Sequence, residues 1–315
     1  METEHCLQVR LSLSGVNVTA PLRLSVVVPT HNRRDVLVSR TLPAIFGQDL
    51  PADEYEVIVV VDGSTDGTID MLERVKPRCA LRVLEQPQRG PSAARNMGIA
   101  ASRGDLVLFL DDDIIPNPDV LRQHAAAHTG PEPLVAHGSI FLAPGTPASV
   151  FACAIASWYK NYFDRLNPQT GLKWPKDDYL ISNSSLPRAA LLACGGFDER
   201  LPAKEDYELG LRLWKRGVRF QYLPQAVAYE FYVKPSRYVL RNDGESFGKT
   251  EVLLCRKHPE YRPYSALAAL RNSTMPRPTP SRRCPILCMA GKRHSLSHIQ
   301  MGGVSKPTWA RGSLT

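Results

Sequence analysis

The sequence of 315 residues lacks any uninterrupted apolar run of the roughly 18 residues that a membrane-spanning helix needs. The most apolar candidate, residues 133–158, contains His137, three prolines and Gly145. The amino terminus carries Glu2 and Glu4 and has no apolar core of signal-peptide length. We therefore expect no membrane span, no secretion and a cytoplasmic location.

Acidic residues are absent after Glu260, although nine lysine and arginine side chains follow it. The net charge of +8 is therefore concentrated at the carboxyl end, and the body of the protein is close to neutral. Scattered Pro, Gly and Ser residues favour a solvated, disordered tail over residues 265–315. The alternative is peripheral contact of this basic tail with an anionic membrane at its inner face.

A regular cysteine framework is also absent, because the seven cysteines are odd in number and unevenly spaced. This usage indicates reduced thiols rather than disulfides. Cys284 and Cys288 have no further ligands nearby at zinc spacing, which argues against a zinc site. The chain is long enough to bury a large core, and its 43% apolar and 22% charged residues are typical of a globular protein.

The most informative stretch is residues 104–113, which read GDLVLFLDDD. Residues 106–110 form an apolar run typical of a parallel strand buried on both faces. Asp111, Asp112 and Asp113 follow at the carboxyl end, where open α/β sheets bind ligands. On an extended chain Asp111 and Asp113 would face one ligand, and such oxygen ligands suit Mg²⁺ or Mn²⁺. A solvated turn is the simpler alternative for three adjacent acids.

Similar strand patterns precede and follow this stretch, each strand ending in polar residues. Strands are predicted at residues 24–28, 56–61 and 81–85, with helices between them, and Pro43 is expected to kink the first helix. Alternating strands and helices predict an α/β fold with a wound, mostly parallel sheet flanked by helices. Arg95, on the first turn of a helix over residues 92–102, can reach the edge of the sheet where ligands bind.

The second half of the chain is less regular. We predict a strand at residues 134–142, then an aromatic-rich helix at residues 148–166 that packs in the core rather than forming an acceptor platform. Asp206 lies on the first turn of a later helix, where the helix dipole favours its ionised form, as a general base requires. An ordinary first-turn acid is the alternative. On the helix that carries Asp206, we expect Leu209, Leu213 and Trp214 to pack inward. Further predicted elements are strands at 219–223 and 226–231 and a helical region at 236–258.

Six blocks in this order resemble the inverting glycosyltransferases of family 2, which have the two-part GT-A fold. Together they span roughly residues 24–232, and each alone is weak. The blocks are residues 27–33 (VVPTHNR), 60–68 (VVDGSTDGT), 90–96 (GPSAARN), 110–113 (LDDD), 195–199 (GGFDE) and 205–212 (EDYELGLR).

The resemblance implies a role for each matching residue. Asp206 is the catalytic base that deprotonates the acceptor hydroxyl, and Asp113 holds a divalent cation, Mg²⁺ or Mn²⁺, that bridges the donor diphosphate. Asp111 lies near the ribose and can share the metal. The other donor-binding residues implied are Pro29, Thr30, Arg33, Asp62, Arg95 and Asp112, with Asp62 accepting a hydrogen bond from the base, usually uracil.

Three departures from the family pattern stand out. Val61 replaces the first Asp of a frequent Asp-Asp-Gly-Ser motif. Glu230 occupies the place of a histidine that often serves as an additional metal ligand, and a carboxylate can ligate the same cation. No resemblance extends beyond Tyr264.

The resemblance implies transfer of a sugar from a nucleotide-sugar donor, most simply a UDP-sugar, to a sugar, lipid-linked or small-molecule acceptor. No nucleic acid and no obligate protein partner are expected. The alternatives are a non-catalytic nucleotide-sugar-binding or scaffold protein, and a nucleotidyltransferase. The predicted organisation is an uncertain extension at 1–22, a nucleotide-sugar-binding part at 23–115, an acceptor-binding and catalytic-base part at 116–264, and the tail at 265–315.

Overall fold

The computed structural model describes residues 9–10, 22–166, 181–233 and 244–268, which belong to one compact unit within Met1–Met275. The second unit, Pro276–Thr315, lies outside the described residues, as does most of the predicted tail. The predicted nucleotide-sugar-binding and acceptor-binding parts, divided at residue 115, both contribute strands to one sheet. Their division by function stays a prediction.

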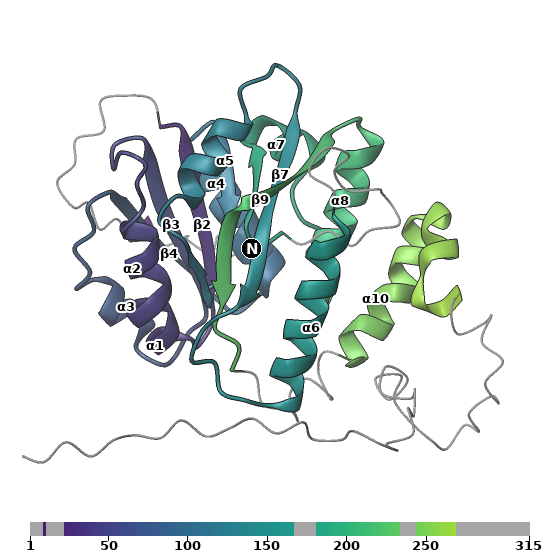
Figure 1. Ribbon diagram of the computed structural model, residues 1–315, viewed down its shortest axis with the longest axis horizontal. Coiled ribbons are helices and arrows are strands. Elements are labelled where there is room, and N and C mark those ends of the chain that lie inside the picture. The colour runs from purple at the N-terminus through teal and green to yellow at the C-terminus, as the bar shows by residue number, and fades with distance from the viewer. Residues whose placement is uncertain (1–8, 11–21, 167–180, 234–243, 269–315) are drawn as a thin grey trace, which may run out of the picture. The chain divides into compact units, whose positions relative to one another are not determined.

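The described residues form a sheet of nine strands in the order β1-β4-β3-β2-β5-β8-β7-β9-β6 (Figure 1). The strands are β1 (Val9–Arg10), β2 (Leu24–Thr30), β3 (Tyr55–Asp62), β4 (Ala80–Gln86), β5 (Leu106–Phe109), β6 (Ile114–Pro116), β7 (Leu134–Leu142), β8 (Ser184–Pro187) and β9 (Arg219–Glu230).

Helices and helical turns connect the strands. They are α1 (Arg34–Val36), the π-helical turn η1 (Leu37–Thr41), α2 (Leu42–Phe46), α3 (Thr68–Leu72), α4 (Pro91–Ala101), α5 (Val120–Ala127), α6 (Val150–Arg165), α7 (Arg188–Cys194), α8 (Glu205–Lys215), α10 (Gly244–Lys257) and the 3-10 turn η3 (Pro259–Tyr264). None of the helices in the described ranges is long and apolar enough to cross a bilayer.

The first half of the fold confirms the predicted parallel sheet. β2 pairs in parallel with both β3 and β5, and β3 pairs in parallel with β4. Every residue of β2, β3 and β5 is buried, because helices cover both faces of such strands. The short β1, in the unassigned extension, adds an antiparallel edge strand to β4.

The second half of the sheet is mixed, and two of its strands were not predicted. β8 pairs antiparallel with β5 and with β7, while β6 pairs antiparallel with β9. The unpredicted strands are β6 and β8, which are only three and four residues long, too short for a periodic signal. The two strands predicted near residues 219–231 form one strand, β9, which pairs in parallel with β7 and has a register shift opposite Gly138 and Ser139.

Pro43 disrupts its helix, as expected. The segment from Arg34 to Phe46 is divided into α1, the π-helical turn η1 and α2, and Pro43 lies in the first turn of α2. Proline has no N–H to donate and its ring collides with the carbonyl four residues earlier. The wider π-helical turn accommodates both effects.

Helix α4 lies very close to β2 because residue 98 is a glycine. A Cβ atom at Gly98 would lie 2.3 Å from Cγ1 of Val27 on β2. No side chain fits at that separation, so the helix approaches the strand at a distance that only glycine permits. This packing fixes the position of Arg95, one turn earlier on α4.

Helix α6 confirms the core interpretation of its aromatic residues. Tyr159, Tyr162 and Phe163 are buried, and Trp158 stacks on Tyr162 with ring centroids 5.2 Å apart. On α8, Leu209 and Leu213 are buried, but Trp214 is 42% exposed. Inward packing of Trp214 was therefore wrong, because its position, about 100° around the helix from Leu213, is exposed to solvent.

The helical region predicted from residue 236 begins, in the described residues, with α10 at Gly244. Residues 236–243 lie outside the described ranges. The cysteines Cys79, Cys153, Cys194 and Cys255 are free thiols, in agreement with the predicted reduced state.

Three histidines are enclosed between α5 and the strands β7 and β8. His124 and His137 are fully buried, and His128 is partly buried. His124 and His128 share the hydroxyl of Ser185, at 2.9 Å and 2.8 Å, and His137 contacts the hydroxyl of Ser184 at 2.8 Å. Burial lowers the pKa of His124 and His128 to about 4 and that of His137 to about 3, so all three are neutral at pH 7.

We expect His128→Gln to gain stability relative to the wild type as the pH is lowered from 8 to 5. The unfolded wild-type chain protonates this histidine near its ordinary pKa of about 6.5, whereas the folded chain resists protonation down to about 4. The stabilising contribution of neutral His128 is therefore complete above about pH 6.5 and is lost progressively below it, by about 2 kcal/mol at pH 5. Urea unfolding of both proteins at each pH measures the difference. A difference that does not change with pH would contradict the buried, neutral state.

Candidate active site

The candidate site lies where the parallel strands β2, β3 and β5 end. Thr30 ends β2, Asp62 ends β3, and Asp111 follows β5 after one residue. Thr30 is paired in register with Val61, so these strand ends lie at the same edge of the sheet. The predicted convergence of the polar strand ends is therefore present in the structure.

The loops that follow β2 and β3 are bound to each other. Asn32 has a φ of 53°, and its backbone N–H donates to the hydroxyl of Ser64 at 3.0 Å. Its side-chain oxygen accepts from the backbone N–H of Thr65 at 2.8 Å. Asp66 accepts from the backbone N–H of Arg34 at 2.9 Å. This exchange of hydrogen bonds holds both loops as one rim of the site.

Asp62 organises the loop that leads into α4. Its Oδ1 accepts from the side-chain amide of Gln86 and from the backbone N–H of Arg89, both at 2.7 Å, and its Oδ2 accepts from the backbone N–H of Gly90 at 2.8 Å. A carboxylate offers about four lone-pair positions, so one on Oδ2 is left for a ligand. The residue predicted to read the base thus also shapes the loop beside the base.

Arg33 pairs with two of the three adjacent acids. Its Nη2 lies 2.5 Å from Oδ2 of Asp113, and its Nε lies 3.8 Å from Oδ1 of Asp112. Thr30 donates its hydroxyl to Oδ2 of Asp112 at 2.8 Å. Burial and the neighbouring charge of Asp113 raise the pKa of Asp112 to about 7, despite Arg33. Asp112 is therefore partly protonated at neutral pH.

The extended geometry expected for Asp111 to Asp113 is wrong, because the chain turns there. Asp112 and Asp113 lie in a turn, and the backbone N–H of Ile114 donates to the carbonyl of Asp111 at 3.1 Å. The acids are shared between two arginines: Asp112 and Asp113 face Arg33, whereas Asp111 pairs with Arg95. A common ligand for Asp111 and Asp113 stays a prediction.

Arg95 joins the end of β5 to the start of α8. Its Nη2 lies 2.7 Å from Oδ1 of Asp111, and its Nη1 lies 2.7 Å from Oε1 of Glu205. The side chain is only 6% exposed. The charges of Asp111, Glu205 and Asp206 raise the pKa of Arg95 above its ordinary value, against the opposing effect of burial. Residues more than 90 positions apart in the sequence therefore meet at one buried guanidinium.

Asp206 is on the first turn of α8, as predicted, but its electrostatics differ from the prediction. Burial and the charge of Glu205 raise the pKa of Asp206 to about 7, against the lowering effect of a backbone hydrogen bond from Tyr207 and of Arg95. The helix dipole was expected to favour the ionised form. Desolvation exceeds it, because the carboxylate loses water as the helix start packs beside the sheet.

A second group of polar side chains surrounds the last of the three adjacent acids. It consists of Asp113, Glu230 and Tyr159. β6 and β9 pair so that Glu230 is opposite Ile114, and the backbone N–H of Phe231 donates to the carbonyl of Asp113 at 2.8 Å. The hydroxyl of Tyr159 donates to Oε2 of Glu230 at 2.8 Å. Burial and the charges of Glu230, Asp113 and Asp111 raise the pKa of Tyr159 well above its ordinary value.

These carboxylates have the chemistry of a divalent-cation site, since hard cations take oxygen ligands. The close approach of Asp112 and Asp113 to the same side chain, Arg33, also fits a cation site. In the described part of the chain, however, no three His, Cys, Asp or Glu side chains are already arranged to hold one. Arg33 and Tyr159 engage the candidate ligands Asp113 and Glu230 instead.

Sequence reasoning missed Glu205, Tyr159 and Gln86 as members of the site. Glu205 stands next to Asp206 in the block EDYELGLR, so its position was a usable signal. Tyr159 was assigned only to the core, because an aromatic side chain at helical spacing gives no indication of what its hydroxyl meets. Pro29 is buried at the end of β2, with no polar side-chain group to place.

The family model for glycosyl transferase family 2 matches residues 25–178. The chain belongs to this family. Validoxylamine A glucosyltransferase of Streptomyces hygroscopicus subsp. limoneus is 31% identical over 235 residues, covering 65% of this chain and 51% of that protein. Poly(ribitol-phosphate) beta-N-acetylglucosaminyltransferase TarS of Staphylococcus aureus strain Mu50 is 27% identical, covering 73% of this chain and 38% of that protein. The chain thus spans about half or less of the length of these curated relatives.

Solved structures show the same fold. TarS residues 1–349 from S. aureus in complex with UDP-GlcNAc aligns with a TM-score of 0.57 and 24% identity, over 74% of this chain and 67% of that one. The mannosyltransferase PcManGT from Pyrobaculum calidifontis, in complex with GDP-Man and Mn²⁺, aligns with a TM-score of 0.59 and 22% identity, over 83% and 71%. This family 2 protein therefore has the GT-A fold that its sequence predicts.

We expect Arg95→Met to destabilise the protein by about 3 kcal/mol, because two acids then lose their shared partner in a largely buried site. Urea unfolding measures the loss. Arg122→Met is the matched control, since Arg122 pairs with Asp49 on the surface and both side chains are more than a third exposed. Its removal should change the free energy of unfolding by less than about 1 kcal/mol. Equal losses in the two variants would contradict the bridging role of Arg95.

Proposed function

We propose that this family 2 glycosyltransferase transfers a sugar from a nucleotide-sugar donor to an acceptor hydroxyl, with inversion at the anomeric carbon and with help from a divalent cation. The observation that carries the proposal is the convergence of Asp111, Glu205 and Asp206 on Arg95 at the ligand-binding edge of the sheet. Acids from a strand end and from a separate helix start thereby border one site.

Asp206 is the proposed general base. Its pKa of about 7 is matched to neutral pH, where a base must be partly ionised and still able to hold a proton. Its carboxylate takes the proton of the acceptor hydroxyl while the hydroxyl oxygen bonds to the anomeric carbon. The bond from that carbon to the diphosphate breaks, and the nucleoside diphosphate leaves from the opposite face with the electron pair.

The donor is proposed to lie along the ends of β2, β3 and β5. Thr30 and Pro29 would border the base and ribose, Asp62 would accept from the base, and Arg33 and Arg95 would face the diphosphate. A uracil base is the specific proposal. The relatives differ in this respect, since the TarS structure contains UDP-GlcNAc and that of PcManGT contains GDP-Man.

Asp113 is the proposed principal metal ligand, with Asp111 and Glu230 as further ligands and Asp112 beside them. When bound, Mg²⁺ or Mn²⁺ would stabilise the charge that builds on the departing diphosphate. Before that, Asp113 has to exchange its contact with Arg33 and Glu230 its contact with Tyr159. Arg33 would then be released toward the anionic donor.

The acceptor is proposed to be a hydroxyl of a sugar, a lipid-linked sugar or another small molecule. Named relatives act on acceptors as different as validoxylamine A and poly(ribitol-phosphate). Loops near Thr146, Trp174 and Lys204 are proposed to select the acceptor. Those near Thr146 and Lys204 are described, whereas Trp174 lies outside the described residues. The cytoplasmic location and peripheral membrane contact stay predictions.

Asp206→Asn should abolish sugar transfer and leave nucleotide affinity within about twofold, because an amide cannot accept the proton. For the wild type, kcat should fall as the pH drops through about 7, where Asp206 becomes protonated. Product formation and calorimetric binding of UDP measure the two properties. Transfer at the wild-type rate by the variant would rule out Asp206 as the base.

Asp113→Asn should weaken binding of UDP in the presence of Mn²⁺ by about tenfold or more, with little effect when EDTA is present, because the metal clamp acts through this carboxylate. Asp35→Asn is the control, since its exposed side chain pairs with Arg34 outside the site. Calorimetric titrations with and without Mn²⁺ separate the two cases. The same affinity loss with EDTA would contradict a metal-binding role.

A panel of nucleotide sugars tests the overall proposal. Each donor is incubated with Mn²⁺ and a set of glycoside and polyol acceptors, and mass spectrometry detects a mass increase of one sugar in an acceptor. We expect product with at least one donor, and none with the Asp206→Asn protein. Tight UDP binding without product from any donor would favour the non-catalytic binding protein instead.

A further inference from the structure

The backbone just before α8 has an unusual conformation. Lys204 has a φ of 52°, in the left-handed region that residues other than glycine rarely adopt. Its carbonyl accepts the backbone N–H of Glu208 at 3.1 Å, one of the first hydrogen bonds of the helix. The conformation of Lys204 therefore sets the direction in which α8 begins, and with it the position of Asp206. Such a conformation persists only where the surroundings hold it.

The side chain of Lys204 is held by a buried acid on a distant helix. Glu251, on α10, is 3% exposed and forms an ion pair with Lys204 Nζ. The hydroxyl of Tyr261 donates to Oε1 of Glu251 at 2.8 Å, and the backbone N–H of Ala266 donates to Oε2 at 2.8 Å. Donors on both oxygens fix the carboxylate in one orientation. Glu251 is thus a rigid anchor rather than a mobile surface partner.

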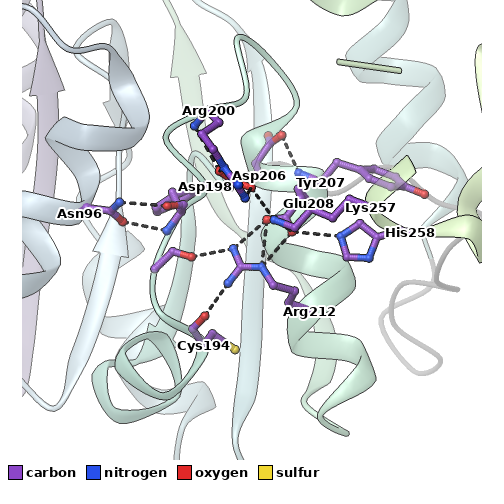
Figure 2. A network of polar contacts seen from close by, with 12 residues as sticks. Asn96, Cys194, Asp198, Arg200, Asp206, Tyr207, Glu208, Arg212, Lys257 and His258 are labelled. Atoms are coloured by element: carbon purple, nitrogen blue, oxygen red, sulfur yellow. Dashed lines mark hydrogen bonds and ion pairs between the residues drawn. The ribbon is translucent and has the colours of Figure 1, made fainter. Parts of the chain in front are cut away.

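A second buried acid ties the same helical turn to the end of α10, as Figure 2 shows. Glu208 is fully buried and forms ion pairs with Arg212 at 2.7 Å and with Lys257 at 2.7 Å. His258 Nε2 lies 3.0 Å from Glu208 Oε1. Burial alone would raise the pKa of Glu208, but the hydrogen bonds from His258, Arg212 and Lys257 hold it at about 2. The carboxylate is therefore charged at any working pH.

Asp206 lies between these two attachment points, two residues after Lys204 and two before Glu208. Figure 2 labels Asp206 and Glu208 on this turn and shows Lys257 and His258 in contact with Glu208. A buried ion pair contributes little net stability compared with apolar packing of similar volume. Its geometric effect is larger, because charged hydrogen bonds define both distance and direction.

We propose that Glu251 is a positioning residue for the catalytic base: it holds Lys204 in its left-handed conformation and so fixes the start of α8 and the carboxylate of Asp206. This inference rests on the proposed function, in which Asp206 is the base. Glu251 itself touches neither substrate nor the reacting atoms. The charged contacts of Glu208 support the same turn from its other end.

The test compares Glu251→Gln with Glu245→Gln. Both substitutions are on α10, but Glu245 is exposed and pairs with Lys249 of its own helix at 2.7 Å. In Glu251→Gln we expect hydrogen exchange at the Glu208 amide to increase about tenfold or more, because the first turn opens locally. Exchange in β3 should not change. In Glu245→Gln neither segment should change.

Kinetics supply a second measurement, using the nucleotide sugar and acceptor that give product in the panel. Glu251→Gln should lower kcat about 10- to 100-fold, since a base displaced by about 1 Å loses that much rate. KM for the donor and calorimetric affinity for UDP should stay within about twofold of the wild type. A variant that is merely less well folded would lose kcat and UDP affinity together.

Glycine at position 204 provides the rescue, because glycine adopts the left-handed region without a side-chain anchor. Lys204→Ala should reproduce the loss seen in Glu251→Gln, and Lys204→Gly should lose less. Adding Glu251→Gln to Lys204→Gly should change kcat by less than about twofold, as expected when two substitutions act through one contact. Lys204→Ala also removes the ion pair from the other side if Glu251→Gln does not fold.

The proposal is overturned if Glu251→Gln matches Glu245→Gln in amide exchange and kcat. It is equally overturned if Glu251→Gln has its full effect in the Lys204→Gly background. Failure of the proposed function has a different signature, since Asp206→Asn would then transfer sugar at the wild-type rate. The exchange measurement needs no substrate and reports on the anchoring of α8 in either case.

Discussion

The site depends on the burial of one cation, the guanidinium of Arg95. Removing a charged group from water costs several kcal/mol unless acids and hydrogen bonds surround it in good geometry. Arg95 meets that requirement only when Asp111 on the sheet side and Glu205 on α8 both face it. Close packing of α4 on β2 at Gly98 fixes the backbone that carries the arginine. The start of α8 is therefore drawn to the edge of the sheet where β2, β3 and β5 end, by charge as well as by apolar packing.

The same combination of burial and charge acts on two aspartates, Asp112 and Asp206, and raises the pKa of each to about 7. Asp112 loses water beside Asp113, and Arg33 opposes part of the increase. Asp206 loses water beside Glu205, and Arg95 opposes part of the increase. The two electrostatic environments are therefore alike. In the proposed reaction the roles of the two residues differ because Asp112 lies beside the proposed metal ligands, whereas Asp206 lies at the start of α8.

Much of the first half of the fold could be predicted from the sequence because its information is local. The strands β2, β3 and β5 are buried on both faces, so each is a continuous apolar run, and polar residues follow at its carboxyl end. Sequence order then places Thr30, Asp62 and Asp111 at one edge. The start of α8 at Glu205 was predictable as well, because acids gather in its first turn and Gly217 follows its end.

What could not be predicted depends on partners far apart in the chain. The turn at Asp112 and Asp113 arises because β6 leaves the direction of β5 to pair with β9, and neither short strand has a periodic pattern. The raised pKa of Asp206 follows from its burial next to Glu205, whereas the sequence shows only a helix start, where the dipole acts in the opposite direction. The role of the Tyr159 hydroxyl likewise requires Glu230, 71 residues away.

The two buried glutamates, Glu208 and Glu251, show how the later part of the chain bears on the site. Each is almost inaccessible to solvent, and each is surrounded by donors that come partly from α10 and η3. Leucine or methionine at these positions would fill similar volume and avoid the cost of burying a charge. Apolar contacts, however, allow a helix to slide or rotate by small amounts, because they have no preferred direction. A charged hydrogen bond between Lys204 and Glu251 does not allow such movement of α8. A catalytic base requires this fixed position, because it must meet the acceptor hydroxyl within hydrogen-bond distance.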